Sequence, residues 1–177
     1  MTGVNPRLLT LPNIPKPLHG LSPRTIFGKE WWDAERRIAY AKAGYCCEAC
    51  GVHKTQALYH KWLEAHEVYD YNYTEGTLTF MGLAALCFAC HNYIHNGRME
   101  MLVREHSMLE ATRLEILHRG DVILREAKIK KPDPPVTCAE WEDWKMIVFG
   151  KEYKGKFKTY LDWLMFYNLP SKEEQEQ

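Results

Sequence analysis

The sequence has no apolar run long enough to span a membrane, no net charge and no internal repeat. A transmembrane helix needs about 18 or more apolar residues, and the first residues lack the charged head and apolar stretch of a secretion signal. We therefore expect a cytoplasmic protein without a membrane partner. The 23 basic residues are balanced by 23 acidic residues. This balance argues against tight, non-specific binding of long duplex DNA, which requires a basic surplus.

Cysteine is also scarce, yet four of the six cysteines form two Cys-x-x-Cys pairs. The pairs are Cys47-x-x-Cys50 and Cys87-x-x-Cys90. In a cytosolic protein this spacing indicates zinc rather than disulfides. Gly51 follows the first pair and allows the backbone to curl around a metal ion. The alternative is that four small side chains fill a core, and we expect Cys46 and Cys138 to be ordinary thiols.

The pattern of residues predicts a mixed α+β chain. Residues 29–43 have helical periodicity. The β-prone stretches 58–68 and 77–81 are separated by Glu75-Gly76 and predict an antiparallel hairpin. A helix is expected to open at the second cysteine pair.

The second half of the sequence is predicted to be mainly helical. Residues 107–110 and 137–140 have the spacing of capping boxes that begin helices, and Gly120 is expected to end the first of these helices. A Pro-rich linker covers 129–136. The predicted segments are an extended arm (1–28), a zinc-binding domain (29–98), a helical extension (99–130), a helical and aromatic segment (137–170) and a disordered tail (171–177).

A group of three histidines forms a second set of candidate ligands. His91 and His95 are four residues apart, so on a helix both imidazoles project from one face. His66 on a predicted strand completes the set. Three protein ligands with one open position are typical of a catalytic metal site. The alternative is that these are surface or packing histidines.

The run Cys-x-x-Cys…Leu-Glu-x-His…Leu-Cys-x-x-Cys-His-x-x-x-His, over about residues 45–97, resembles the Cys-bearing branch of the HNH (ββα-metal) nuclease superfamily. The resemblance implies a zinc-stapled ββα core, preceded by a helix and followed by a helical extension. It implies structural Zn²⁺ on Cys47, Cys50, Cys87 and Cys90. It also implies a second divalent ion (Mg²⁺, Mn²⁺, Ni²⁺ or Zn²⁺) on His66, His91 and His95.

Two positions depart from the family pattern. Glu67 stands where the family usually has its general-base histidine, and Gly82 stands where it usually has asparagine. A carboxylate within reach of a metal-bound water can act as a base, so His66 and Glu67 are the predicted catalytic residues. Neighbours on a regular strand face opposite sides, so this pairing requires the strand to bend or end. Glu64 is either a solvated carboxylate or a partner that orients a histidine.

The implied function is metal-dependent hydrolysis of phosphodiester bonds in nucleic acid, with Arg98 and Arg104 as phosphate contacts. Lysines and aromatics alternate over 145–158, a pattern found in nucleic-acid surfaces and also in ordinary solvated loops. One alternative is an inactive HNH-like scaffold that binds a protein or nucleic-acid partner through its aromatic C-terminal segment. A further alternative, consistent with the neutral charge, is a phosphodiesterase acting on a small nucleotide.

Overall fold

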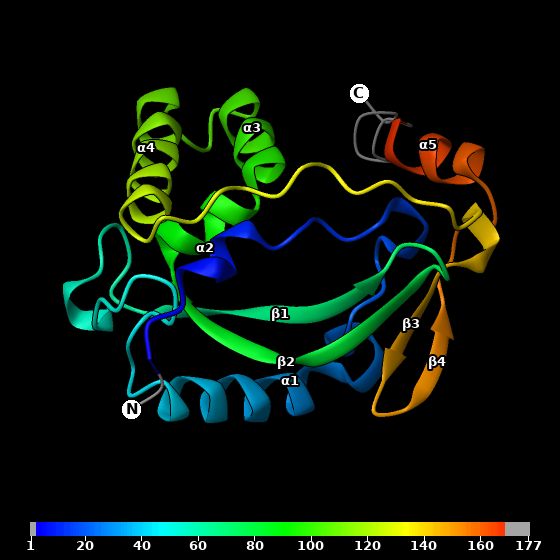
Figure 1. Cartoon of the computed structure of the whole chain (residues 1–177), viewed down its shortest axis with the longest axis horizontal. Coiled ribbons are helices and arrows are strands. Elements are labelled where there is room, and N and C mark those ends of the chain that lie inside the picture. The colour runs from blue at the N-terminus through cyan, green and yellow to red at the C-terminus, as the bar shows by residue number, and fades with distance from the viewer. Residues whose placement is uncertain (1–2, 169–177) are drawn as a thin grey trace, which may run out of the picture. The chain divides into compact units, whose positions relative to one another are not determined.

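A computed structural model describes residues 3–168, and within that range the chain is a mixed α+β protein with five α-helices and one four-stranded sheet (Figure 1). The predicted disordered tail, 171–177, lies outside the described residues. The described chain divides into two compact units: residues 3–13, 29–68 and 81–134, and residues 14–28, 69–80 and 135–168. No helix in the described range has the length and apolar character needed to cross a membrane.

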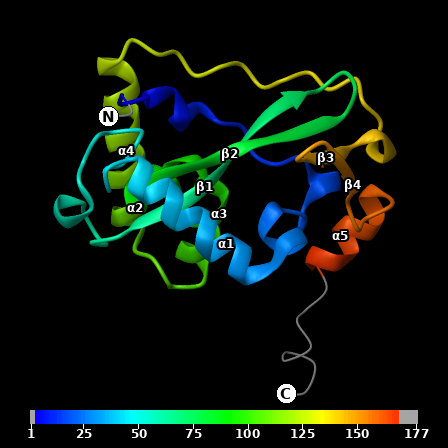
Figure 2. The same cartoon turned by 90° about the horizontal axis from the view of Figure 1, so that it is seen from below.

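A long β-hairpin supplies strand residues 63–68 and 81–87 to the first unit and residues 69–80 to the second. Its strands are β1 (Leu63–Asn72) and β2 (Thr77–Cys87). The hairpin predicted over 58–68 and 77–81 is therefore confirmed, although β1 begins five residues later and β2 continues to the second cysteine pair. Within the first unit, residues 29–42 of α1 (Pro23–Lys42) lie along one side of the hairpin (Figures 1 and 2). Its part after a kink at Gly28 matches the helix predicted over 29–43.

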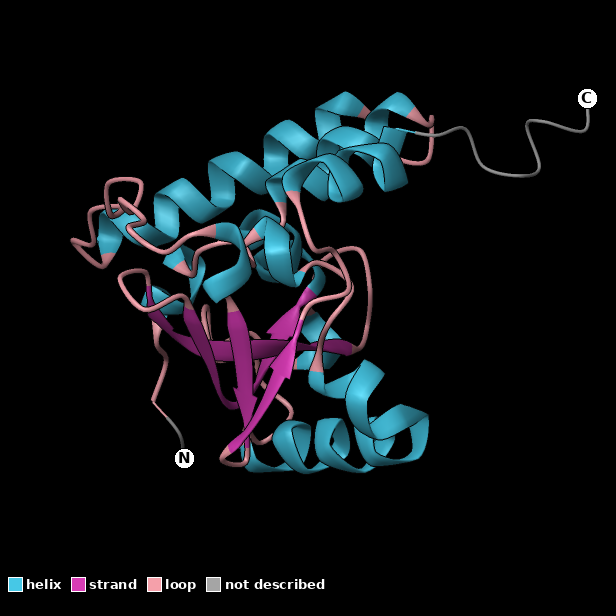
Figure 3. Ribbon diagram, turned by 90° about the vertical axis from the view of Figure 1, so that its right-hand side faces the viewer, coloured by secondary structure: helices cyan, strands magenta, loops and turns pink. Residues whose placement is uncertain are grey.

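Three further helices lie on the other side of the hairpin in the first unit (Figures 1 and 3). They are α2 (Phe88–Ile94), α3 (Asn96–Arg104) and α4 (Glu110–Glu126). The buried core of this unit includes Ala85, Leu86, Ile94 and Met99 together with three of the paired cysteines. The candidate ligands are therefore at the centre of the packing rather than at its edge.

Helix α4 continues past the glycine that was predicted to end it. It runs from Glu110 to Glu126 with Leu109 as its N-cap and no side-chain cap, so the predicted capping box at 107–110 and the predicted stop at Gly120 are both wrong. A Cβ atom at position 120 would lie 2.1 Å from Cδ2 of Tyr93. Glycine therefore serves the close approach of α4 to the Tyr93 ring, which is a tertiary requirement that local sequence does not reveal.

We expect Gly120→Ala to destabilise the first unit by ~1–3 kcal/mol or more, since an added methyl group would overpack this contact. The Tyr93 ring has little room to move because its hydroxyl donates to Asp121 Oδ1 at 2.6 Å and Lys131 Nζ lies 4.7 Å from its centroid. The control is Gly97→Ala in α3, where an added Cβ meets nothing within 4 Å. It should be neutral or stabilising by up to ~1 kcal/mol. Free energies of unfolding from urea titrations test the difference, and equal effects would contradict it.

The second unit contains a short hairpin where a helix was predicted. Strands β3 (Lys145–Val148) and β4 (Lys151–Lys154) pair antiparallel, and β3 pairs parallel with the start of β2. A capping box does form, but it joins Glu140 and Asp143 on one 3-10 turn. Met146 and Val148 are then buried at a period of two, so the helix predicted to begin at 137–140 is wrong. The predicted helix near the end of the chain is present as α5 (Tyr160–Asn168).

Candidate metal centres

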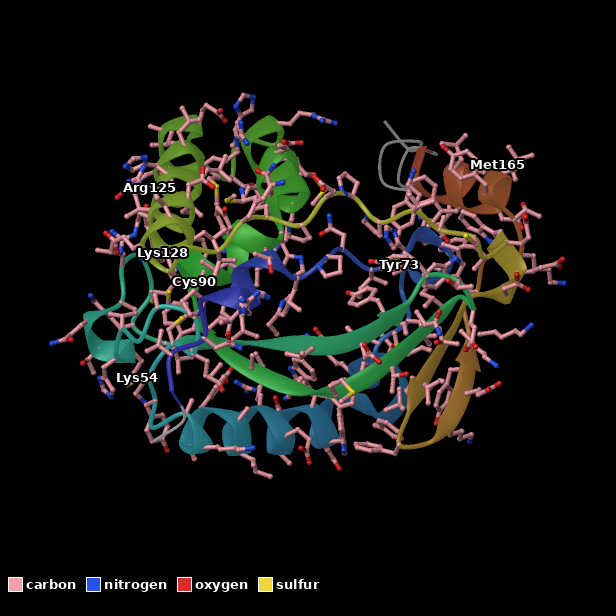
Figure 4. The ribbon with its side chains drawn as sticks, viewed as in Figure 1. Lys54, Tyr73, Cys90, Arg125, Lys128 and Met165 are labelled. Atoms are coloured by element: carbon pink, nitrogen blue, oxygen red, sulfur yellow. The ribbon has the colours of Figure 1, made fainter. Side chains whose placement is uncertain are left out.

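Four cysteine sulfurs converge in the first unit. Cys47 and Cys50 belong to the turn that follows α1, whereas Cys87 ends β2 and Cys90 lies in the first turn of α2 (Figure 4). The four Sγ atoms lie within 4.8 Å of one another, and those of Cys50 and Cys87 are 3.9 Å apart. Sulfurs ~2.3 Å from a tetrahedral zinc lie ~3.8 Å apart, whereas a disulfide needs ~2.05 Å. The group can therefore hold a zinc ion.

The backbone of the first cysteine turn has the curled geometry predicted from Gly51. This glycine has a φ of +78°, and its N–H donates to the Cys47 carbonyl at 2.7 Å. Glu48 joins this turn to β2, a role that was not predicted from the sequence. Its N–H donates to the Ala85 carbonyl at 2.8 Å, and its carboxylate accepts the Ala85 N–H at 2.7 Å. Glu48 thus holds the two cysteine pairs together from a point two residues before Cys87.

The sulfur group needs a cation if all four members are to ionise. The pKa of Cys47 is lowered because the thiols of Cys50, Cys87 and Cys90 donate hydrogen bonds to its sulfur. The pKa of Cys90 is raised because its thiol donates hydrogen bonds to the sulfurs of Cys47, Cys50 and Cys87 and because it is buried. A divalent ion allows all four cysteines to lose their protons together, since thiolates are the ligands that zinc binds. Cys46 and Cys138 lie outside every candidate ligand group in the described residues.

The three predicted histidines also converge. His66 lies on β1, His91 on α2 and His95 at the C-cap of α2. Their ligand nitrogens lie within 4.8 Å of one another, and the ring centroids are 4.8–5.4 Å apart. His66 is only 6% exposed, and its Nδ1 has no hydrogen-bond partner among the described residues. An unpartnered ring nitrogen in a buried trio of imidazoles fits a site that can take an ion.

Two of the histidines are held in the form that a metal requires. The pKa of His66 is lowered to about 3, mainly because the ring is buried and also because His95 and His91 lie nearby. Burial likewise lowers the pKa of His95 to about 4, with contributions from His91 and Arg98. Both rings are therefore neutral at pH 7, and neutral imidazole is the ligand form.

Glu64 orients one of these rings. One oxygen of its carboxylate, Oε2, lies 2.5 Å from Nδ1 of His91. Burial acts to raise the pKa of Glu64, but the His91 hydrogen bond and the Arg98 charge outweigh burial and lower it. A carboxylate that accepts a hydrogen bond from Nδ1–H leaves the lone pair of Nε2 available to a metal ion, and it fixes the plane of the ring. Of the two interpretations of Glu64, this contact supports the one in which it orients a histidine.

We expect Glu64→Gln to weaken metal binding at the histidine group by about 10–100-fold, the usual cost of losing such a partner. Structural zinc should stay bound, because the cysteine group does not involve Glu64. Titration of the zinc-loaded protein with Co²⁺ or Ni²⁺, followed by calorimetry, measures the affinity. Glu67→Gln is the matched control on the same strand and should leave the affinity unchanged. Equal losses in the two variants would contradict the assigned role of Glu64.

The other predicted site residues lie outside the histidine group. Strand β1 is continuous through position 67, so alternation directs Glu67 to the face opposite Glu64 and His66. Gly82 lies within β2. Arg98, on α3, is exposed and acts electrostatically on both Glu64 and His95. Arg104 ends α3, ~9 Å further along the helix axis at ~1.5 Å per residue.

The two candidate ligand groups thus lie on one arrangement of β1, β2 and α2. The cysteines connect the end of β2 and the start of α2 to the turn after α1, and the histidines connect β1 to α2. Comparison with family models, with curated proteins and with solved structures gave no match for this chain. The two candidate ligand groups are therefore the features of this chain that point to a function.

Proposed function

We propose that this chain is a metal-dependent hydrolase of phosphodiester bonds with an HNH-like ββα core. The observation that carries the proposal is the second ligand group. Three imidazoles, buried to different degrees, converge from β1 and α2, and one is oriented by Glu64. A purely structural zinc protein has no need of this group, since the cysteines already provide four ligands.

Each residue of the histidine group and its neighbours has a proposed role in hydrolysis. His66, His91 and His95 would hold the second ion, and three protein ligands leave a position open for water or phosphate. When bound, the ion supplies a Lewis acid and lowers the pKa of a water molecule. Glu64 holds the His91 ring and its proton at Nδ1. Arg98 provides positive charge beside the group, where a phosphate carries its negative charge.

The predicted general base is Glu67, which follows His66 on β1. Glu67 remains the predicted base, although β1 directs it away from His66 unless the strand bends when substrate binds. The pKa of a zinc-bound water lies near ~7, so catalysis at neutral pH does not require a strong base. Loss of the Glu67 carboxylate is therefore expected to lower the rate of hydrolysis and not the affinity for the ion.

The test is a cleavage assay with the zinc-loaded protein. Plasmid, single-stranded DNA, RNA and a dinucleotide are incubated with Mg²⁺, Mn²⁺, Ni²⁺ or Zn²⁺, and wild type is compared with His66→Ala and Glu67→Ala. Cleavage by wild type that is lost in His66→Ala supports the proposal. Cleavage of the dinucleotide alone would favour a small-nucleotide phosphodiesterase. Three equally inert proteins on every substrate would exclude hydrolysis of those substrates.

One observation favours a second candidate function, a zinc-braced scaffold that binds a partner. Helix α5 exposes several large apolar side chains, among them Tyr160, Leu161, Met165, Phe166 and Tyr167. Exposed aromatics of this kind are enriched in binding hot spots. The scaffold requires only the cysteine zinc, so the metal content of the protein separates it from the hydrolase.

A further inference from the structure

A group of exposed aromatic side chains adjoins the histidine group in the first unit. Residues 58–62 were predicted to begin a strand, but β1 starts at Leu63 and these residues form a loop. Tyr59 has a φ of +66°, which turns the chain back at this point. Tyr59 is 40% exposed and Trp62 is 55% exposed. Two large aromatic side chains therefore face solvent immediately before the strand that carries Glu64 and His66.

A short series of contacts links this loop to the candidate ligands. The Trp62 ring stacks on His60 with centroids 4.2 Å apart and planes inclined by 20°. Nδ1 of His60 lies 3.8 Å from Oε1 of Glu64, and the other oxygen of Glu64 contacts His91. The Trp62 ring is thus two side chains away from a candidate metal ligand.

The loop is braced against α2, so the aromatic rings have a defined position. Phe88, the first residue of α2, packs edge-on against His60 at 4.3 Å between centroids and lies 5.5 Å from the Tyr59 ring. The Tyr59 hydroxyl donates to Glu115 at 2.7 Å, and Lys61 Nζ donates to the Ala57 carbonyl at 2.8 Å. The Phe88 contacts hold the loop on α2, the helix that carries His91, and the Tyr59 hydrogen bond joins the loop to α4.

The chemistry of this surface suits an unpaired base. His60 covers one face of the Trp62 ring, so much of the exposed area must belong to the opposite face and the edges. A flat aromatic face accepts a nucleobase by stacking, whatever the base, but only when that base is free of a duplex. Zero net charge is unfavourable for gripping a duplex by its phosphates. Stacking supplies affinity that does not depend on a basic surplus.

We infer that Tyr59, His60 and Trp62 form a base-stacking platform, and that the substrate is single-stranded nucleic acid. One unpaired base would lie on Trp62, and its neighbouring phosphodiester would lie at the histidine group beside Arg98. The position of the phosphodiester rests on the proposed hydrolase function. The binding of an unpaired base by Trp62 does not, and it can be measured without cleavage.

The test measures binding of fluorescein-labelled 12-mers by anisotropy, with the full zinc-loaded chain and no second metal added. Single-stranded DNA, single-stranded RNA and a DNA duplex of the same sequence are compared. We expect both single strands to bind more tightly than the duplex. Trp62→Ala should weaken single-strand binding about tenfold or more, as removal of a stacking ring usually does. Trp62→Phe retains a stacking ring and should keep most of the affinity.

Phe149→Ala is the comparison variant, because Phe149 is 70% exposed and belongs to the 145–158 segment, the other nucleic-acid surface that the sequence suggested. It should bind the single strands as wild type does. Circular dichroism of Trp62→Ala establishes that the variant is folded. Equal affinity for single strand and duplex, or a loss in Phe149→Ala without a loss in Trp62→Ala, would overturn the platform.

The platform and the hydrolase can fail separately. If Trp62→Ala loses single-strand binding but wild type cleaves nothing with any metal, the platform stands and the hydrolase does not. If wild type cleaves duplex and single strands equally and Trp62→Ala cleaves as well as wild type, the hydrolase stands and the platform does not. A preference between the DNA and RNA single strands identifies the natural sugar.

Discussion

Replacing Cys90 by serine is expected to release the structural zinc and to unfold the first unit. Binding of structural zinc contributes ~10–16 kcal/mol to the folding of small zinc domains at neutral pH, which is as large as the whole stability of an ordinary domain. Cys90 is only 3% exposed, and it packs in the same cluster as Leu86 and Ile94. Loss of the ion would leave three sulfurs, two of them on buried residues, in competition for protons at that cluster.

Metal analysis by mass spectrometry and thermal unfolding by circular dichroism measure this effect together. Wild type should retain a tightly bound zinc after dialysis, and Cys90→Ser should retain none and show no cooperative transition for the first unit. Cys138→Ser is the control, because Cys138 is exposed and outside the ligand group. It should match wild type in both measurements. A Cys90→Ser protein with full zinc content and an unchanged midpoint would refute the assignment.

The parts of the fold that sequence predicted are those set by short-range chemistry. The two Cys-x-x-Cys turns and the Glu75-Gly76 turn each lie within a few residues, and each has few ways to satisfy its backbone. Residues 29–43 have a helical periodicity that is visible without knowing the partner. That periodicity did not identify the packed side of the helix, since Ile38 is 58% exposed and Ala39 is the buried residue. Between them these signals predicted α1, the hairpin and the start of α2.

The parts that were missed depend on partners distant in the sequence. Gly120 has the appearance of a helix stop, but its role is to admit the Tyr93 ring, 27 positions earlier in the chain. The run from Lys145 to Val148 is too short to identify as a strand alone, and it becomes one because Thr77 and Leu78 lie beside Lys145 and Met146. The capping box predicted at 137–140 forms instead between Glu140 and Asp143, where it closes a single turn.

The candidate site shows the same division. Spacing identified the cysteine and histidine groups as candidate ligands, because an i, i+4 pair on a helix and a nearby strand histidine have few arrangements. It could not identify Glu48 as the link between the cysteine turns, since its partner Ala85 lies on β2, 37 residues later in the chain. Nor could it choose between the interpretations of Glu64, because that choice depends on where its oxygens lie relative to His91. Ligand identity is local information, whereas ligand orientation is tertiary information.

His91→Ala and His95→Ala are each expected to remove a second metal ion while leaving the cysteine zinc in place. Two of three imidazoles bind a divalent ion much more weakly than three, and His91 also loses the ring that Glu64 orients. If the ion supplies several kcal/mol of transition-state stabilisation, hydrolysis should fall by about 10³-fold or more at ~1.4 kcal/mol per tenfold. Equilibrium dialysis against Mn²⁺ or Ni²⁺ followed by metal analysis counts the ions, and the cleavage assay measures the rate.

His118→Ala is the matched control, since His118 is an exposed residue of α4 outside the ligand group. It should keep both ions and full activity. A wild-type protein that binds only one zinc, with a content unchanged by His91→Ala and His95→Ala, would contradict the hydrolase and favour the scaffold. The two variants change different positions, one within α2 and one at its C-cap, so an ion lost in both depends on the convergence of the rings. Loss in one variant alone would instead indicate local damage to α2, which the thermal midpoint of each variant would reveal.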